Sequence, residues 1–345
     1  MKKILVVCAA LMLPCLLVHA QEADSTETGT VLNIIPRLDL NPMFSTKKGV
    51  DNDFNLGNSS LYTLFEGDIT ENISFSIANH WLSREPKYLY KHLVRSDDVN
   101  WLDWGYLTFK LSDKWSLSAG KVVVTTGGFE EDDYDWNVHP QIGSGFWNYL
   151  PVYQWGGSLD WQVNENNTLT AQMSCSPYGR RPLKSGLFNY SAQWRGTFGN
   201  FETLSSFTFV QHTKFGKGTD FFDCFQKVLT IGLRANWEPA VVTLDVFNKV
   251  GNEEELLVNG ITVVPSVLVS INDNMEVLGK VAFEHMSDKL PDFSKDAVRF
   301  GGAFHWRPIK DNDALRLHAV ASYDSISKMV TLSAGVLYNF SIKVN

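Results

Sequence analysis

The sequence predicts an all-β protein, an antiparallel meander of about sixteen strands closed into a transmembrane β-barrel. Three observations predict this fold. Segments of about ten residues alternate apolar and polar side chains, and this is the length that a tilted strand needs to cross a bilayer. Short connections alternate with long ones along the chain. Aromatic residues collect at the strand ends beside the short connections.

The alternation of side chains is regular enough to place the strands. Within 152-163, for example, Leu159 and Trp161 alternate with Asp160 and Gln162. Successive side chains of a strand point to opposite faces, so each segment has one apolar and one polar face. On this basis we expect strands at 31-40, 58-68, 72-82, 101-111, 115-124, 152-163, 168-176, 188-198, 201-211, 224-237, 241-249, 261-271, 275-284, 297-307, 315-323 and 329-340.

The connections between these segments fall into two classes. The short ones are rich in turn-forming residues: 69-71, 112-114, 164-167, 199-200, 238-240, 272-274 and 308-314. The long ones lie between them: 83-100, 125-151, 177-187, 212-223, 250-260 and 285-296. This order is typical of outer-membrane barrels, which have short periplasmic turns and longer external loops. The aromatic residues that adjoin the short turns or the chain end fit an interfacial girdle: Trp115, Trp161, Phe198, Phe201, Trp237, Trp306 and Phe340.

A soluble, secreted β-sandwich or lectin is the alternative fold, because its strands also alternate. Such a sandwich buries its apolar faces in a core, and it does not explain so many consecutive hairpins. A closed barrel, in contrast, pairs every backbone group without leaving an edge in the hydrocarbon. The barrel is therefore the favoured interpretation.

The N-terminal segment has the layout of a signal peptide. Lys2 and Lys3 precede an apolar run that is too short to span a bilayer, and Ala20 is the expected cleavage site. Cys15 makes a lipoprotein the alternative, although Pro14 before it fits a lipid-attachment site poorly. We therefore divide the chain into a signal peptide (1-20), a short polar lead-in (21-30) and a barrel domain (31-345) exported to the bacterial outer membrane.

The composition argues against several classes of function. The chain has a formal charge of -8, and removal of its two N-terminal lysines lowers this to -10, so nucleic acid is not an expected partner. Cys175 and Cys224 remain after cleavage, without the spacing of a metal or redox motif. The sequence also lacks a glycine-rich phosphate loop and a cluster of ligating side chains. We expect no metal and no cofactor.

The connection after the fifth predicted strand is acidic and aromatic. Its candidate constriction residues lie within 125-150: Phe129, Glu130, Glu131, Asp132, Asp133 and Asp135. One interpretation is a solvated acidic loop at the cell surface. The other, favoured by the position and the aromatic residues, is a loop that folds into the barrel and narrows its lumen. A barrel of this width leaves an open lumen unless something fills it.

Basic residues on the polar faces of the strands would line this lumen. The candidate pore-wall residues are Arg37, Lys110, Arg195, Arg234, Lys280, Arg299 and Arg316. Carboxylates share these faces at Asp160, Glu202, Asp245, Glu276 and Glu284. Our hypothesis is that the basic wall faces the acidic loop across a gap. The resulting transverse field would order permeating dipoles and bias the passage of ions.

The segment 101-131, which contains LTFKLSDKWSLSAGK, resembles the phosphate-selective porin O and P family. The likeness lies in a strand, a short turn, a strand that ends in Gly-Lys, and then the loop. Over 31-340 it is architectural. The resemblance implies a homotrimer of independent pores for small solutes, with anions such as phosphate as one option. The segment 125-150 contains no lysine and the chain has no dense run of arginine, so phosphate selectivity remains the minor alternative.

The sequence thus predicts an outer-membrane porin, a water-filled channel for passive diffusion of small hydrophilic solutes or ions. Its expected partners are outer-membrane lipid, those solutes and two further copies of the chain. A non-conducting structural or adhesive barrel is one alternative. A barrel hydrolase is another, but His80, His212 and His318 do not form a recognisable constellation with a nucleophile. We therefore do not expect an enzyme.

Overall fold

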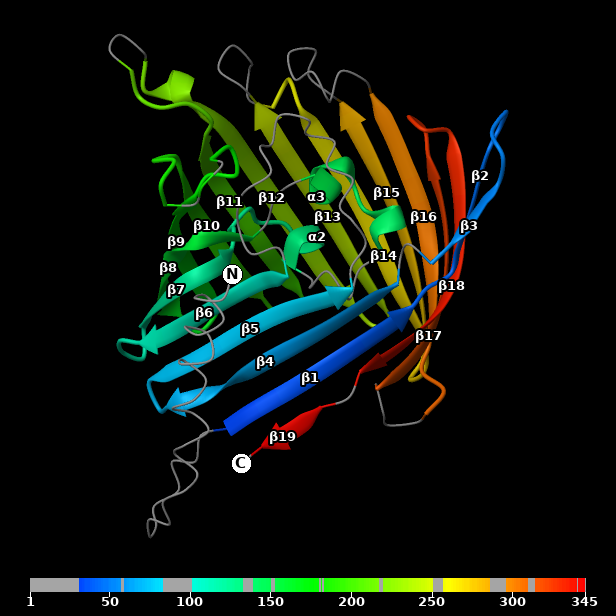
Figure 1. Cartoon of the computed structure of the whole chain (residues 1–345), viewed down its shortest axis with the longest axis horizontal. Coiled ribbons are helices and arrows are strands. Elements are labelled where there is room, and N and C mark those ends of the chain that lie inside the picture. Colours follow the sequence, from blue (N-terminus) through cyan, green and yellow to red (C-terminus); the bar gives the residue numbers. More distant parts are fainter. Residues whose placement is uncertain are drawn as a thin grey trace, which may run out of the picture.

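A computed structural model describes most of the predicted barrel domain. The described residues are 31-56, 59-82, 101-132, 139-149, 153-179, 181, 183-216, 220-250, 257-285, 296-309, 314-339 and 341-344. The predicted signal peptide (1-20) and lead-in (21-30) lie outside them. The described strands form one antiparallel sheet that closes on itself as a barrel (Figure 1).

Sixteen strands form the barrel wall, and each lies within a few residues of a predicted segment. Their bounds are β1 (Val31–Leu40), β4 (Ser60–Thr70), β5 (Ile73–Leu82), β6 (Leu102–Lys110), β7 (Trp115–Val123), β8 (Tyr153–Asn164), β9 (Asn167–Cys175), β10 (Phe188–Phe198), β11 (Phe201–Gln211), β12 (Phe225–Trp237), β13 (Ala240–Val250), β14 (Ile261–Asn272), β15 (Met275–His285), β16 (Ala297–Trp306), β17 (Leu315–Asp324) and β18 (Met329–Asn339). Consecutive wall strands pair as hairpins, which confirms the predicted meander.

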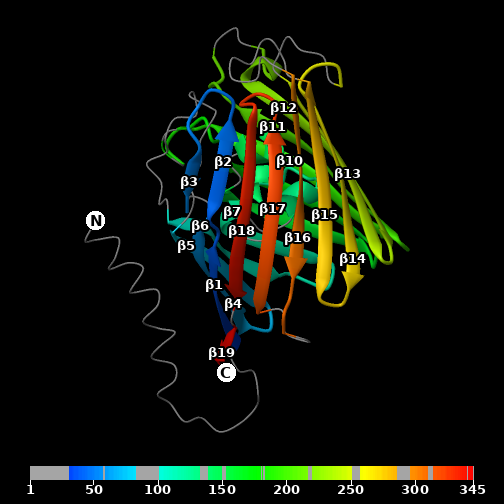
Figure 2. The same cartoon turned by 90° about the vertical axis from the view of Figure 1, so that its right-hand side faces the viewer.

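Three further strands were not predicted: β2 (Met43–Lys47), β3 (Asp53–Asn55) and β19 (Ile342–Val344). β2 and β19 extend the closure of the barrel, whereas β3 pairs with β2 alone. β1 pairs with β18 through Arg37–Leu40, and β2 continues along β18 after a break at Asn41 and Pro42. β19 pairs with the beginning of β1. The two ends of the barrel sequence therefore meet side by side, with β18 and β2 adjacent in Figure 2.

The two faces of the wall differ as the alternation predicts. Large apolar side chains on the outer face remain exposed to the surroundings of the barrel, for example Leu159, Trp161, Ile231 and Val336. Indole rings of Trp115 and Trp161 stack beside the short turns, with centroids 5.4 Å apart. A soluble β-sandwich would bury such residues in a core. The exposed apolar face thus favours the barrel over that alternative.

Short helices lie in two of the long connections. The connection from β7 to β8 contains α2 (Phe129–Asp132), η2 (Pro140–Ile142) and α3 (Gly145–Tyr149), and η3 (Phe222–Cys224) precedes β12. Within the described residues, no helix has the length and apolar character needed to cross a membrane. Residues of α2 contact β12 and β13, whereas η2 contacts β16 and β17. The described part of the connection after β7 therefore lies inside the barrel, as predicted (Figure 1).

Candidate functional site

The candidate site is the connection after β7, which we call the internal loop (residues 124-132 and 139-149 of the described chain). Of the predicted constriction residues, Asp133 and Asp135 lie outside the described residues, and only the backbone of Glu131 is described. The remaining members, Phe129, Glu130 and Asp132, belong to α2. The geometry of the loop follows from a series of contacts with the inner wall.

Two consecutive glycines bring the loop backbone against the wall. Gly128 has a φ of +83°, and its N–H donates to the carbonyl of Leu204 on β11 over 2.9 Å. A Cβ at Gly128 would lie 2.7 Å from the ring of Phe247 on β13. Opposite, a Cβ at Gly232 of β12 would lie only 3.0 Å from the Cα of Gly128. The close approach thus requires a residue without a side chain at both positions.

A wall carboxylate caps the helical turn of the loop. The two oxygens of Asp245 on β13 accept hydrogen bonds from the backbone N–H groups of Phe129 and Glu130, at 2.8 and 2.9 Å. These donors have no partner within the turn, and a carboxylate is the acceptor best suited to them. Beside the cap, the guanidinium of Arg234 lies 4.0 Å from the ring centroid of Phe129. Both contacts hold α2 against β12 and β13.

Glu130 is a deeply enclosed charged side chain of the loop. One oxygen accepts from the backbone N–H of Ser144 at 2.9 Å, and the other accepts from the Ser144 hydroxyl at 2.6 Å. The ammonium group of Lys280 on β15 lies 2.5 Å from Glu130, and their side chains are 12 % and 2 % exposed. Because both charges are withdrawn from water, loss of either partner would strand the other. Glu130 therefore fastens the loop to the wall instead of facing the open lumen.

A second buried ion pair binds the first residue of α3. Glu284 on β15 accepts a hydrogen bond from the N–H of Gly145 and pairs with Arg299 on β16. Arg299 also donates from Nε to Asp324 on β17 over 2.9 Å. A Cβ at Gly145 would lie 2.6 Å from Nη1 of Arg299, so a larger residue at this position would displace the buried ion pair.

Three histidine rings form the contact between the second part of the loop and the wall, which we call the far contact. Nε2 of His139 lies 2.8 Å from Nε2 of His305 on β16. The ring centroid of His139 is 5.1 Å from those of both His305 and His318 on β17. His318 in turn lies 2.9 Å from Asp39 of β1 through its Nε2. Next to these rings, Ile142 packs against Ala303 and Val320.

The predicted wall residues lie in three places: at the loop contacts, near the far contact and at a short turn. Lys280, Arg234, Arg299 and Arg195 contact the loop or the groups that bind it, since Arg195 pairs with Asp132. Arg37 and Arg316 act electrostatically on His139 and therefore lie near the far contact. Lys110 pairs instead with Asp113 at a short turn, over 2.9 Å.

This placement corrects the predicted transverse field. The hypothesis required a gap between the basic wall and the acidic loop, but Lys280 and Arg195 are in direct contact with Glu130 and Asp132. The charges neutralise each other in pairs because the loop lies on the basic side of the wall. Sequence patterning shows which side chains face the lumen, whereas the distance between two of them depends on the path of the loop.

On the other side of the lumen, the inner face of β4 to β9 carries a polar network that the prediction covered only in part. Ser76 donates to Glu66 over 3.3 Å, and Thr170 donates to Asp160 over 2.6 Å. Hydroxyls of Thr108 and Ser118 are 2.9 Å apart in between. Asp160 was visible as a polar-face residue, but Glu66 was missed, although Phe65 and Gly67 on either side are consistent with its inward position.

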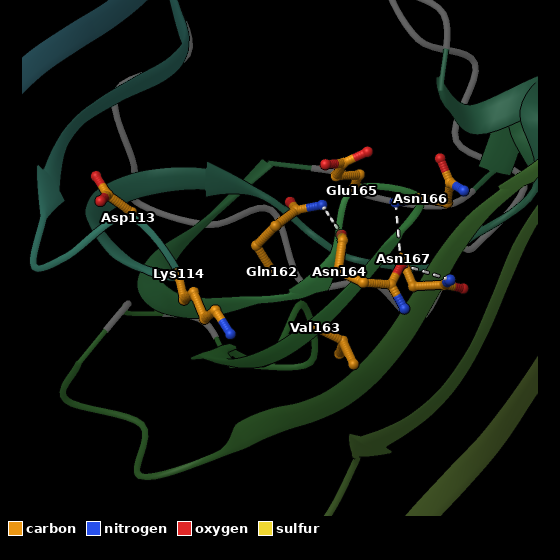
Figure 3. Close-up of a pocket in the computed structure, with 8 residues that line it drawn as sticks. All are labelled: Asp113, Lys114, Gln162, Val163, Asn164, Glu165, Asn166 and Asn167. Carbon is orange, nitrogen blue, oxygen red and sulfur yellow. Dashed lines mark hydrogen bonds between the residues drawn. The ribbon is translucent and has the colours of Figure 1, made fainter.

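A surface hollow of about 610 Å³ lies at the short turns, outside this site (Figure 3). Its lining comes from the β6–β7 and β8–β9 connections and the adjoining end of β8, and most of these residues are exposed. Asn164 binds two neighbours there, because its side-chain oxygen accepts from Asn166 and Asn167 at 3.0 and 2.9 Å. These hydrogen bonds shape the turn and do not point to a ligand.

Comparison with known proteins agrees on the fold. No family model and no curated protein matches the chain. Among solved structures, a triple mutant of the Rhodopseudomonas blastica porin is similar over 90% of this chain and 100% of that chain, with a TM-score of 0.58 and 11% identity. Outer-membrane expressed OmpT of Vibrio cholerae is similar over 92% of this chain and 100% of that chain, with a TM-score of 0.56 and 10% identity. The chain therefore has a porin-type barrel fold.

Proposed function

We propose that this protein is an outer-membrane porin through which small hydrophilic solutes or ions diffuse passively. The observation that carries the proposal is the internal loop, which is fastened to the inner face of β11 to β18 by contacts within the barrel. This arrangement narrows the barrel without a separate plug domain in the described chain. The polar inner face of β4 to β9 then forms the opposite side of a wetted passage.

The contacts of the histidines favour a passage over a hydrolase. His80 pairs with Asp103 through Nδ1 at 2.5 Å, and His318 pairs with Asp39. Within the described residues, neither imidazole is hydrogen-bonded to a serine or cysteine side chain, as a nucleophile activated by histidine requires. We infer that the protein is not an enzyme and that these histidines act in the structure of the wall.

Location and assembly are part of the same proposal. The apolar outer face suits the hydrocarbon of the bacterial outer membrane, and cleavage after Ala20 would release the exported chain. One OmpT structure with the same fold is described as a trimer form, with a TM-score of 0.53 and 10% identity. This supports a homotrimer. The relationship to the phosphate-selective porin O and P family also remains a proposal, based on the segment 101-131.

Reconstitution into planar bilayers tests the channel directly. We expect stepwise increases in current that grow with the concentration of protein, because each inserted barrel opens a water-filled path. Swelling of protein-loaded liposomes in sugars of increasing size would then give the size limit set by the loop. Heat-denatured protein is the control. Correctly folded, inserted protein that carries no current would refute the proposal and favour the non-conducting structural barrel.

A further inference from the structure

The charged side chains of the lumen are distributed unequally between its two sides. On the side covered by the loop, four basic groups are matched by carboxylates in contact, while Arg37 and Arg316 lie near His139 at the far contact. Lys280 pairs with Glu130, Arg299 with Glu284, Arg195 with Asp132, and Arg307 with Glu276. A permeating ion therefore meets little net positive charge from these groups, because each pair is nearly neutral at a distance.

Glu66 and Asp160 on the opposite side are not matched in this way. Glu66 on β4 is bound by the hydroxyl of Ser76, and Asp160 on β8 is bound by the hydroxyls of Thr170 and Ser116 at 2.6 and 3.4 Å. Within the described residues, neither carboxylate forms an ion pair. Both are half-buried, so they keep access to water.

The two carboxylates belong to one stretch of the inner wall. Asp160 lies between Leu159 and Trp161, whose exposed apolar side chains mark the opposite, outer face of β8. Both Glu66 and Asp160 act electrostatically on the phenol of Tyr106, which stands on β6 between their strands. Hydroxyl groups stabilise a carboxylate without cancelling its charge. The wall that faces the docked loop therefore carries net negative charge.

We infer that the passage prefers cations to anions and that Glu66 and Asp160 are the residues that determine this preference. Fixed charge in a narrow, water-filled path with a low-dielectric wall raises the local concentration of counter-ions and lowers that of co-ions. The inference rests on the proposed channel function. It is opposite to the anion option that the resemblance to the phosphate-selective family implies.

Reversal potentials in a KCl gradient test the inference. We expect the wild-type barrel to be cation-selective, and the double variant Glu66→Gln, Asp160→Asn to lose this preference by about two- to five-fold near 0.1 M salt. Each single variant should fall between the two. The amides keep the size and the hydrogen-bond acceptors of the acids, so the conductance steps should remain.

Glu165→Gln is the matched control, because it removes one carboxylate from the exposed turn between β8 and β9. It should leave the reversal potential unchanged. An anion-selective wild-type channel, or a double variant with unchanged selectivity, would overturn the inference while leaving the channel itself established. A folded barrel without any current would instead overturn the proposed function, and the inference with it.

Discussion

The protonation of His139 is coupled to the position of the internal loop, because this loop residue contacts the wall at His305. Burial lowers the pKa of His139 well below the ordinary value of 6.5, and the electrostatic influence of its neighbours His305, His318, Arg316 and Arg37 lowers this pKa further. The other facing groups are carboxylates: Asp39 beside His318, and Glu276 beside His305. His139 is therefore neutral while the loop is docked.

The sign of the pH effect follows from this depressed pKa. Above about pH 6.5 His139 is neutral whether the loop is docked or displaced. In this range pH therefore does not change the equilibrium between the docked and the displaced loop. Below that value the displaced loop takes up a proton that the docked loop does not. We predict that docking weakens as pH falls from 7.5 to 5.5, seen as more frequent current fluctuations of single channels. The variant His139→Gln should reduce this pH dependence, and equal dependence in both proteins would contradict the assignment.

Individual residues differ in how far the sequence could predict them. Alternation assigns Arg299 and Lys280 to the polar face of their strands, because a strand has a fixed period. Alternation could not predict the contacts between the wall and the loop. Phe129 and Asp245, for example, are separated by 116 positions and meet only after the loop has folded inward. The consecutive Gly127 and Gly128 were the available signal for a close backbone contact. Nothing in the sequence indicated which wall residues these two glycines would contact.

At the scale of elements, the internal loop depends on contacts that only glycine permits. A side chain at Gly128 would be unfavourable for two separate reasons. The backbone is left-handed there, and the side chain would collide with the ring of Phe247. We predict that Gly128→Ala displaces the loop and makes the single-channel current larger and noisier, while the barrel still folds. The wall is unchanged in this variant because the substitution lies in the loop.

Gly199 offers a control, because its backbone is also left-handed. Its φ is +61°, it lies in the short turn between β10 and β11, and a Cβ there would meet nothing within 4 Å. Gly199→Ala should cost about 1 kcal/mol of stability through its backbone alone and leave the current unchanged. If both variants behaved alike, backbone strain and not loop docking would explain the effect of Gly128→Ala.

The sequence predicted long elements far better than short ones. All sixteen wall strands have enough alternating positions to define a face, which is why each was placed within a few residues. β2, β3 and β19 have only five, three and three residues, too few to show a period. The pairing of β2 and β19 depends on neighbours at the other end of the chain.

For the molecule as a whole, the apolar outer face predicts that a charged substitution there costs more stability than one on the inner face. Ile231, in the middle of β12, is 39% exposed on the outer face, whereas Gln193, in the middle of β10, has the position of an inner residue. Ile231→Arg should destabilise the folded barrel by about 2–4 kcal/mol, because the charge would enter hydrocarbon. Gln193→Arg should cost much less, since its side chain remains in water.

Reversible unfolding by denaturant in lipid vesicles measures both variants. The difference between them is the informative quantity, because each adds the same guanidinium to a central position of a wall strand. Equal losses of stability would show that the two faces meet the same solvent. That result would contradict a membrane-spanning barrel.

The junction of β1 with β18 and β19 places a constraint on biogenesis. Every other wall pairing joins strands that are neighbours in the chain, but this one joins residues such as Arg37 and Asn339. The cylinder therefore cannot be completed until the last strand has been delivered, and an unfinished intermediate exposes two unpaired edges. A chain truncated before Met329 would keep its remaining hairpins, but its open edges would be available for pairing with other chains.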